Sequence, residues 1–282
     1  MNAAISFVFS SILGGIDSLG RMILTNLEYT YRVTMMVYLA LRAGIFDQAQ
    51  GMRTIFGVVS AQIYFTGWQA VPIISILALA SGSVVILQGS SQLTLLGGTE
   101  MLGNLLVVII VRELGPLITA LVVIARSGTA VASEIGNMRA NREIEALESV
   151  GINPLSFIVF PRLVGGVVSV VCLAIYFTLM ALLGGFGVTK LIHDISFQFY
   201  LDSLARGIAA EDLGLFLLKN LFSGTIIFVN CCYQGLSVRR SPTEVPVVTT
   251  QAVVKSIIYV VAFNLIVTTL FYLNQLIKLG VI

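Results

Sequence analysis

The stretch LVGGVVSVVCLAIYFTLMALLGGFGVT, residues 163–189, decides the fold, because it contains no charged side chain. A helix needs roughly 20 apolar residues to cross the hydrocarbon core of a bilayer, and this stretch is longer than that. A second uncharged run covers residues 256–277. A spanning β-barrel would show alternating segments of about 10 residues, and neither run alternates. The chain is therefore predicted to cross a membrane as α-helices.

The composition of the whole chain agrees with this prediction. Of its 282 residues, 57% are hydrophobic and 11% are charged, whereas soluble domains carry about 25% charged residues. The mean hydropathy of +0.98 is too high for a water-soluble surface. The formal net charge of +2 gives no reason to expect a nucleic-acid partner. The first basic residue is Arg21, so we expect no cleavable signal peptide.

We predict an all-α membrane protein with about five transmembrane helices. The predicted spans lie at about residues 69–90, 101–126, 160–188, 214–237 and 251–275. Residues 1–55 carry scattered charges and no clean apolar run, which indicates one or two amphipathic helices in the membrane interface. Residues 54–67 are predicted to be an elbow leading into the first span. The chain thus divides into an interfacial region, 1–55, and one transmembrane domain, 56–282.

The placement of Lys and Arg predicts the orientation of the chain. One set of loops comprises the N-terminal region, residues 134–162 and residues 238–255, and together it holds ten basic residues. The opposite set holds three. Because cytoplasmic loops are enriched in Lys and Arg, we expect the N-terminus in the cytoplasm and the C-terminus on the other side.

The segment VRELGP, residues 111–116, places charges inside a predicted span. At 1.5 Å per residue, Arg112 and Glu113 lie about 16 Å from the start of this span, near its middle. A charge at that depth costs at least about 2.5 kcal/mol, so it usually faces a partner or a cavity. Pro116 has no N–H and leaves the carbonyl of Arg112 free, and Gly115 loosens the same turn, which predicts a kink. The segment suits either a substrate contact or a structural ion pair.

Lys219 is a further charge in an apolar setting, near the start of the fourth span. Its side chain could extend to the outer interface and keep the ammonium in water. It could equally point into a cavity shared with Glu113. The sequence leaves both interpretations open.

The polar segment between the second and third spans, residues 134–154, is predicted to contain a cytoplasmic helix. Arg139 and Glu143 are four residues apart and can pair on one face. Gly151 suits the end of this helix and Pro154 prevents its continuation. Such a helix could dock into a groove of a partner protein or could lie in solvent. Small residues at 125–136 favour close helix packing, within the chain or between copies.

Several chemistries find no support in the residues. The chain has no G-x-x-x-x-G-K-[ST] loop, so we expect no ATP bound in that way. Its single histidine, His193, has no Cys or His cluster around it, so we expect no metal site. The three cysteines fall in predicted spans and are interpreted as packing residues. No nucleophile has a credible histidine partner, so no catalytic residue and no cofactor are predicted.

Four segments carry a resemblance to a known family. They are RELGPLITA (112–120), ARSGTA (125–130), ASEIG (132–136) and EALESVGINP (145–154). Together they resemble the MlaE permease family, and the resemblance extends over about residues 60–275. The family comprises permeases of ABC systems that move phospholipids or other lipids between the inner membrane and the outer envelope.

The resemblance implies partners for the chain. Two permease copies would form the membrane core, in the bacterial inner membrane, and a separate cytoplasmic ATPase would bind the ATP. An MCE-domain protein would sit on the outer face, and a STAS-domain regulator would accompany the ATPase in many such systems. The identity of the lipid, the direction of transport and the choice between two identical permeases and two paralogues stay open.

The resemblance also implies roles for individual residues. The lipid cavity would be lined by Arg112, Glu113, Leu114, Gln88 and Lys219. The helix that couples the permease to the ATPase would contain Arg139, Arg142, Glu143, Glu145, Leu147, Glu148 and Gly151. Relatives can carry an acidic residue in the last span, and the nearest position here is Asn264, so we expect a charge partner to be missing.

Two other functions compete with lipid transport by an ABC system. An ion-coupled secondary transporter would use Glu113 as a proton carrier and would need no ATPase. A membrane-embedded enzyme that modifies lipids is a third possibility, and the lack of a catalytic cluster argues against it. A neighbouring ATPase gene and MCE-domain gene would favour the first function.

Overall fold

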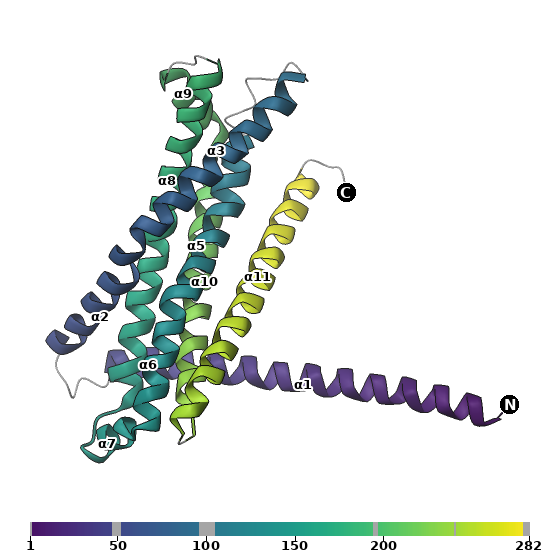
Figure 1. Cartoon of the computed structure of the whole chain (residues 1–282), viewed down its shortest axis with the longest axis vertical. Helices are drawn as coiled ribbons and strands as arrows, with labels where there is room; N and C mark the ends of the chain where they lie inside the picture. Colours follow the sequence, from purple (N-terminus) through teal and green to yellow (C-terminus); the bar gives the residue numbers. More distant parts are fainter. Residues whose placement is uncertain (1, 47–51, 96–104, 194–196, 240, 279–282) are drawn as a thin grey trace.

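The computed structural model describes residues 2–46, 52–95, 105–193, 197–239 and 241–278. These residues form helices and contain no strand (Figure 1). Five helical segments are long and apolar enough to cross a membrane, namely Ile55–Gly89, Val107–Ala140, Leu155–Leu191, Ala210–Leu236 and Pro242–Lys278. The prediction of an all-α membrane protein with about five spans is confirmed.

The N-terminal region forms one long helix, α1 (Asn2–Phe46), which runs crosswise to the bundle and extends past it (Figure 1). Leu24, Leu27 and Phe46 on this helix are exposed apolar side chains. Its inner face packs closely on the bundle, because a Cβ on Gly44 would lie 2.2 Å from the ring of Phe160. The exposed apolar face fits the predicted interfacial position. The domain boundary at residue 55 stays a prediction.

Tyr29 fastens α1 to the bundle. Its hydroxyl donates to Asn230 and accepts from the amide of Gln234, 3.0 Å away. Lys255 lies over its ring, 4.0 Å from the centroid. Burial raises the pKa of the Tyr29 phenol, so the hydroxyl stays neutral and keeps its role as a donor.

The first span begins earlier than predicted. It consists of α2 (Met52–Thr66), η1 (Trp68–Ala70) and α3 (Val71–Leu95). The candidate span starts at Ile55, so most of the segment 54–67 belongs to the span itself. Its apolar side chains suit lipid, and at Gly67, between α2 and η1, a Cβ would lie 2.7 Å from the carbonyl oxygen of Ile63.

The second span continues beyond its predicted end at residue 126. It is built from η3 (Val107–Leu114), α5 (Gly115–Val123), η4 (Ile124–Gly128) and α6 (Thr129–Ala140). The polar residues after 126 do not break the helix, because none of them is Pro. Four of the small residues at 125–136 are buried within the chain, namely Ser127, Gly128, Ala132 and Gly136. A Cβ on Gly128, for example, would lie 3.1 Å from the Sγ of Cys231 on α10 (Ala210–Leu236).

The predicted cytoplasmic helix is shorter than expected. It is α7 (Glu143–Ser149), and it is separated from α6 by a tight turn in which Arg142 has a φ of 62°. The predicted pair of Arg139 and Glu143 is therefore wrong, because the turn rotates α7 away from the line of α6. Arg139 instead pairs with Glu145 at 3.5 Å. Gly151 ends the helix with a φ of +78°, as predicted.

The remaining spans pack at unequal depth in the bundle. The third comprises η5 (Leu155–Val159) and α8 (Phe160–His193), which leads to α9 (Phe197–Gly207). The fourth is α10, and the fifth is η6 (Pro242–Glu244) with α11 (Val245–Lys278). In the most apolar stretch of α10, 61% of the residues are buried inside the structure. In the corresponding stretch of the fifth span, 17% are buried. The face of α11 that points away from the other helices is therefore available to lipid or to another protein.

Candidate functional site

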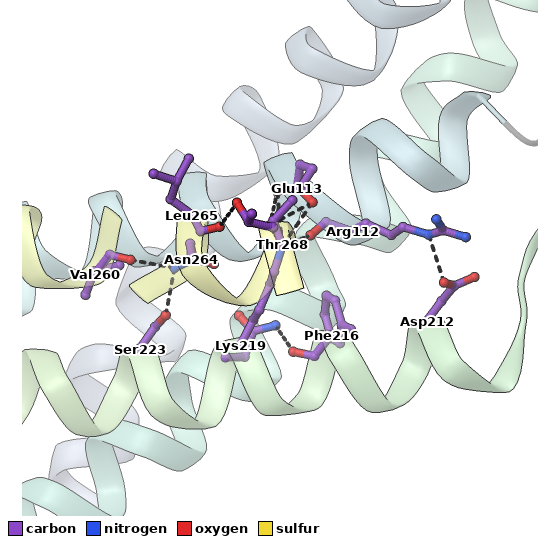
Figure 2. A network of polar contacts seen from close by, with 12 residues as sticks. Arg112, Glu113, Asp212, Phe216, Lys219, Ser223, Val260, Asn264, Leu265 and Thr268 are labelled. Atoms are coloured by element: carbon purple, nitrogen blue, oxygen red, sulfur yellow. Dashed lines mark hydrogen bonds and ion pairs between the residues drawn. The ribbon is translucent and has the colours of Figure 1, made fainter. Parts of the chain in front are cut away.

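Lys219 on α10 is the centre of a polar cluster between η3, α10 and α11 (Figure 2). Its side chain is 0% exposed. The ammonium donates to the carbonyl of Arg112 at 2.7 Å and to the hydroxyl of Thr268 at 2.7 Å. It also contacts both carboxylate oxygens of Glu113, at 3.0 and 3.1 Å. Lys219 therefore does not extend toward the interface, and it lies beside Glu113.

The contact with the Arg112 carbonyl follows from the local sequence. Pro116 cannot donate to that carbonyl, so the acceptor is free within η3. The N–H of Gly115 bonds to the carbonyl of Ile110, five residues back, which is the spacing of a π-turn. A buried ammonium needs acceptors, and the opened turn supplies one at membrane depth.

Arg112 forms the second ion pair of the site. Its Nε lies 2.8 Å from Oδ1 of Asp212, whose side chain is 1% exposed. The other oxygen of Asp212 accepts from the N–H of Ala209 at 2.9 Å, which caps the start of α10. The Arg112 guanidinium also lies 5.4 Å from the ring centroid of Phe271. Arg112 is thus fixed by two spans besides its own.

The fifth span contributes hydroxyl and amide groups to the site. Thr268 lies 3.1 Å from both carboxylate oxygens of Glu113. One turn away, the amide of Asn264 donates to Ser223 at 3.2 Å and to the carbonyl of Val260 at 2.9 Å. The last span therefore contributes no acidic side chain at Asn264, as expected from the sequence. The polar contact of α11 with Glu113 comes from Thr268.

The four charged groups differ in their accessibility. Lys219 and Asp212 are fully buried and Arg112 is 11% exposed, whereas Glu113 is 37% exposed. The two positive and two negative groups balance formally. The cations are enclosed by their partners, and the Glu113 carboxylate is the member that a ligand can reach.

The position of the site along the second span differs from the prediction. Because the second span continues to Ala140, Arg112 lies near the end of the helix closer to α9 and is not central. Arg126 lies nearer the middle. Leu114 is partly buried next to Glu113. Gln88 is exposed at the end of α3 and makes none of the polar contacts of the cluster that the structure describes.

Sequence reasoning missed Asp212, Thr268 and Phe271. Asp212 lies two residues before the predicted fourth span, and an acidic residue at the start of a helix is the signal that could have identified it. Thr268 and Phe271 carry no charge and sit in an apolar run, so nothing in the sequence distinguishes them.

The residues predicted to couple the chain to a partner surround the turn between α6 and α7. Glu145 is paired with Arg139, and Leu147 packs against the core. Arg142, Glu143 and Glu148 are exposed. This end of the bundle thus presents a short helix with exposed acidic side chains.

Among the described residues, no group of three His, Cys, Asp or Glu could hold a metal ion. Cys172 is exposed, while Cys231 and Cys232 are buried, and all three are free thiols. The side chain of His193 lies outside the described residues. The site offers ionic and hydrogen-bonding groups to a ligand.

Comparisons with known proteins give one consistent result. The family model described as Permease MlaE matches residues 59–270. A probable ABC transporter permease protein from Rickettsia bellii is 29% identical over 77% of this chain and 84% of its own length. The intermembrane phospholipid transport system permease protein MlaE from Haemophilus influenzae is 31% identical over 62% of this chain and 65% of its own. The chloroplastic protein TRIGALACTOSYLDIACYLGLYCEROL 1 from Arabidopsis thaliana is 28% identical over 75% of this chain and 60% of its own.

Proposed function

The chain belongs to the MlaE permease family, and on this basis we propose that it is the membrane subunit of an ABC transporter that moves phospholipid between the inner membrane and the outer envelope. The observation that carries the proposal is the family match, which spans the whole bundle from residue 59 to residue 270. The name of the Haemophilus relative supports phospholipid as the cargo.

The site has features that a phospholipid permease needs. A phospholipid has two apolar tails and a polar headgroup, so its path must combine apolar walls with a few ionic groups. The Glu113 carboxylate is partly accessible and stands beside buried cations. Leu114 next to it is apolar. Arg112, Glu113, Leu114, Gln88 and Lys219 are the proposed cavity residues, with the role of Gln88 resting on the family resemblance alone.

The mechanism is mechanical, because the chemistry belongs to the partner. We place the α7 end of the bundle in the cytoplasm, with the N-terminus, and the C-terminus on the periplasmic side. ATP would be bound and hydrolysed by a separate ATPase that docks on α7. Two copies of the permease would form the core, with an MCE-domain protein on the outer face and in some systems a STAS-domain regulator. Motion of α7 would reach the cluster through the continuous second span, Val107–Ala140.

Glu148 offers the sharpest test of ATPase docking. It is exposed and makes none of the recorded ion pairs of α7, so Glu148→Arg reverses a charge without breaking a contact inside the chain. The wild-type protein, purified from its native membrane, is expected to carry an ATPase and extractable phospholipid. The Glu148→Arg variant is expected to lose the ATPase and to retain the fold.

The control is Glu211→Arg, at the other end of the bundle, where the exposed Glu211 pairs with Lys278. This variant should retain the ATPase. If the wild type purifies without an ATPase and takes up substrate in liposomes on a proton gradient, the chain is an ion-coupled transporter with Glu113 as the proton carrier.

A further inference from the structure

Arg126 is a charged residue near the middle of the second span that the proposed cavity does not use. Its Nη1 donates to the carbonyl of Phe65 at 2.7 Å and its Nη2 to the side-chain carbonyl of Gln69 at 2.7 Å. The guanidinium lies 5.0 Å from the ring centroid of Phe65. These contacts join η4 to the point where α2 gives way to η1.

The hydrogen-bond partners of Arg126 are neutral, whereas Arg112, Lys219 and Arg162 each form an ion pair. Arg112 pairs with Asp212, and Lys219 with Glu113. Arg162 pairs with Glu134 at 2.8 Å. Arg126 makes no ion pair with any described residue. Because arginine stays charged in proteins and an unpaired charge in a membrane is costly, the positive charge of Arg126 calls for an anion.

The guanidinium still has donors to offer. It carries five N–H groups in a planar fork, and two of them are used by Phe65 and Gln69. Arg126 is partly exposed, and its neighbour Ala125 is exposed. An oxyanion approaching from this side could accept two parallel hydrogen bonds, which is the preferred geometry between arginine and phosphate.

The position of Arg126 along the helix restricts the source of that anion. Arg126 lies 13 residues from Glu113 and eight from Glu134, which is about 20 Å and about 12 Å along the helix. The pair of Glu134 and Arg162 marks the polar α7 end of the bundle. Arg126 therefore lies within the second membrane-spanning segment, between the Glu113–Lys219 cluster and the polar α7 end, where a lipid headgroup is the anion that a membrane supplies.

We propose that Arg126 binds the phosphate of a phospholipid, at a second site about 20 Å from the Glu113–Lys219 cluster along the second span. The inference rests on the proposed function, because it makes Arg126 part of an intermediate binding site for the transported lipid. The ligand group is the phosphodiester shared by phosphatidylethanolamine and phosphatidylglycerol. The first span forms one wall of this site through Phe65 and Gln69.

The test is photocrosslinking in vesicles of phosphatidylethanolamine and phosphatidylglycerol labelled with radioactive phosphorus. The full chain carries benzoylphenylalanine in place of Ala125, next to Arg126. Arg126→Gln is expected to lower labelling at this position about tenfold, the effect of losing one charge-assisted hydrogen bond. Arg126→Lys keeps the charge and should retain part of the labelling. A probe at Leu265, which is 68% exposed on α11, reports bulk lipid and should not change.

Gln69→Ala separates binding from a structural role. This variant removes a partner of Arg126 but keeps its charge, so labelling at position 125 should persist. If Gln69→Ala and Arg126→Gln lower labelling equally, Arg126 only holds the junction of α2 and η1 in place and the proposal is wrong. It is also wrong if neither Arg126 variant changes labelling, or if excess inorganic phosphate abolishes it, because the site then takes free anions.

The crosslinking experiment needs no ATP and no partner protein. Labelling that depends on Arg126 in a chain that fails to move phospholipid would overturn the proposed function and leave the phosphate site in place. Phospholipid transport that is unaffected by Arg126→Gln, with unchanged labelling, would overturn the site and leave the function.

Discussion

Replacing Glu113 by Gln is expected to destabilise the protein more than replacing Lys219 by Met, although both changes break the same ion pair. The reason is the unequal burial of the two groups, since Lys219 is 0% exposed and Glu113 is 37% exposed. Glu113→Gln leaves a buried ammonium without its counter-charge. Lys219→Met leaves a carboxylate that water can partly reach.

The magnitudes follow from the recorded contacts. Removing one partner of a buried ion pair costs about 3–5 kcal/mol. Glu113→Gln should fall near the lower limit, about 3 kcal/mol, because Lys219 keeps the Arg112 carbonyl and Thr268 as acceptors. Lys219→Met should cost about 1–2 kcal/mol, mainly for the unsatisfied Arg112 carbonyl. The double variant carries neither charge, so it should be more stable than the sum predicts, with a coupling of about 1–3 kcal/mol.

Reversible unfolding of the four proteins by sodium dodecyl sulfate in mixed micelles measures these differences as free energies of unfolding. Equal denaturant dependence across the set would show that the folded states are comparable. The reasoning is refuted if Lys219→Met is the more damaging single change, or if the two effects simply add. The first result would mean that unequal burial does not set the cost of breaking the pair, and the second that the ammonium and the carboxylate do not depend on each other.

Three further changes test other parts of the structure. Thr268→Val removes the hydroxyl that lies between Lys219 and Glu113, and it should lower the free energy of unfolding by about 1 kcal/mol in the same assay. The control, Thr269→Val, removes an exposed hydroxyl that bonds only within α11, and it should cost less than about 0.5 kcal/mol. Gly82→Ala should lower the midpoint temperature of unfolding, because its Cβ would lie 1.9 Å from a carbonyl oxygen of α8. The control, Gly187→Ala, meets nothing within 4 Å and should leave this temperature unchanged or raise it. Gly151→Ala forces a side chain into a φ of +78° and should cost about 1 kcal/mol and weaken ATPase binding in a pull-down. A Gly82→Ala protein as stable as the Gly187→Ala protein would mean that α3 and α8 are not in close contact.

Local chemistry made part of the site predictable from the sequence. The missing N–H of Pro116 frees the carbonyl of Arg112 whatever surrounds it, and the apolar context of Lys219 shows that the ammonium needs partners. The sequence could not choose between the interface and Glu113 for that ammonium. The choice depends on how α10 packs against η3, which is a contact between residues more than 100 positions apart.

The errors in the prediction also have physical causes. The predicted second span ends at Arg126, yet η4 continues the helix through this charged residue. The pair of Arg139 and Glu143 was expected from helical spacing, but Arg142 takes a left-handed conformation that favours glycine, and no side chain in the segment signals this. Asp212 was overlooked because its cap at Ala209 and its pairing with Arg112 both need the folded bundle.

The two polar sites of the second span present opposite groups to the membrane. In the cluster near α9, Lys219 is enclosed by the Arg112 carbonyl and Glu113, and Arg112 is paired with Asp212. The accessible group of this cluster is therefore the carboxylate of Glu113. At Arg126 the accessible group is a cation held by neutral partners. A phospholipid headgroup with an anionic phosphate and N–H or O–H donors therefore meets a complementary group at each site, though not both at once, because about 20 Å of helix separates them. Under the proposed function, passage of the lipid between these two sites is the step that ATP hydrolysis on a partner would have to drive.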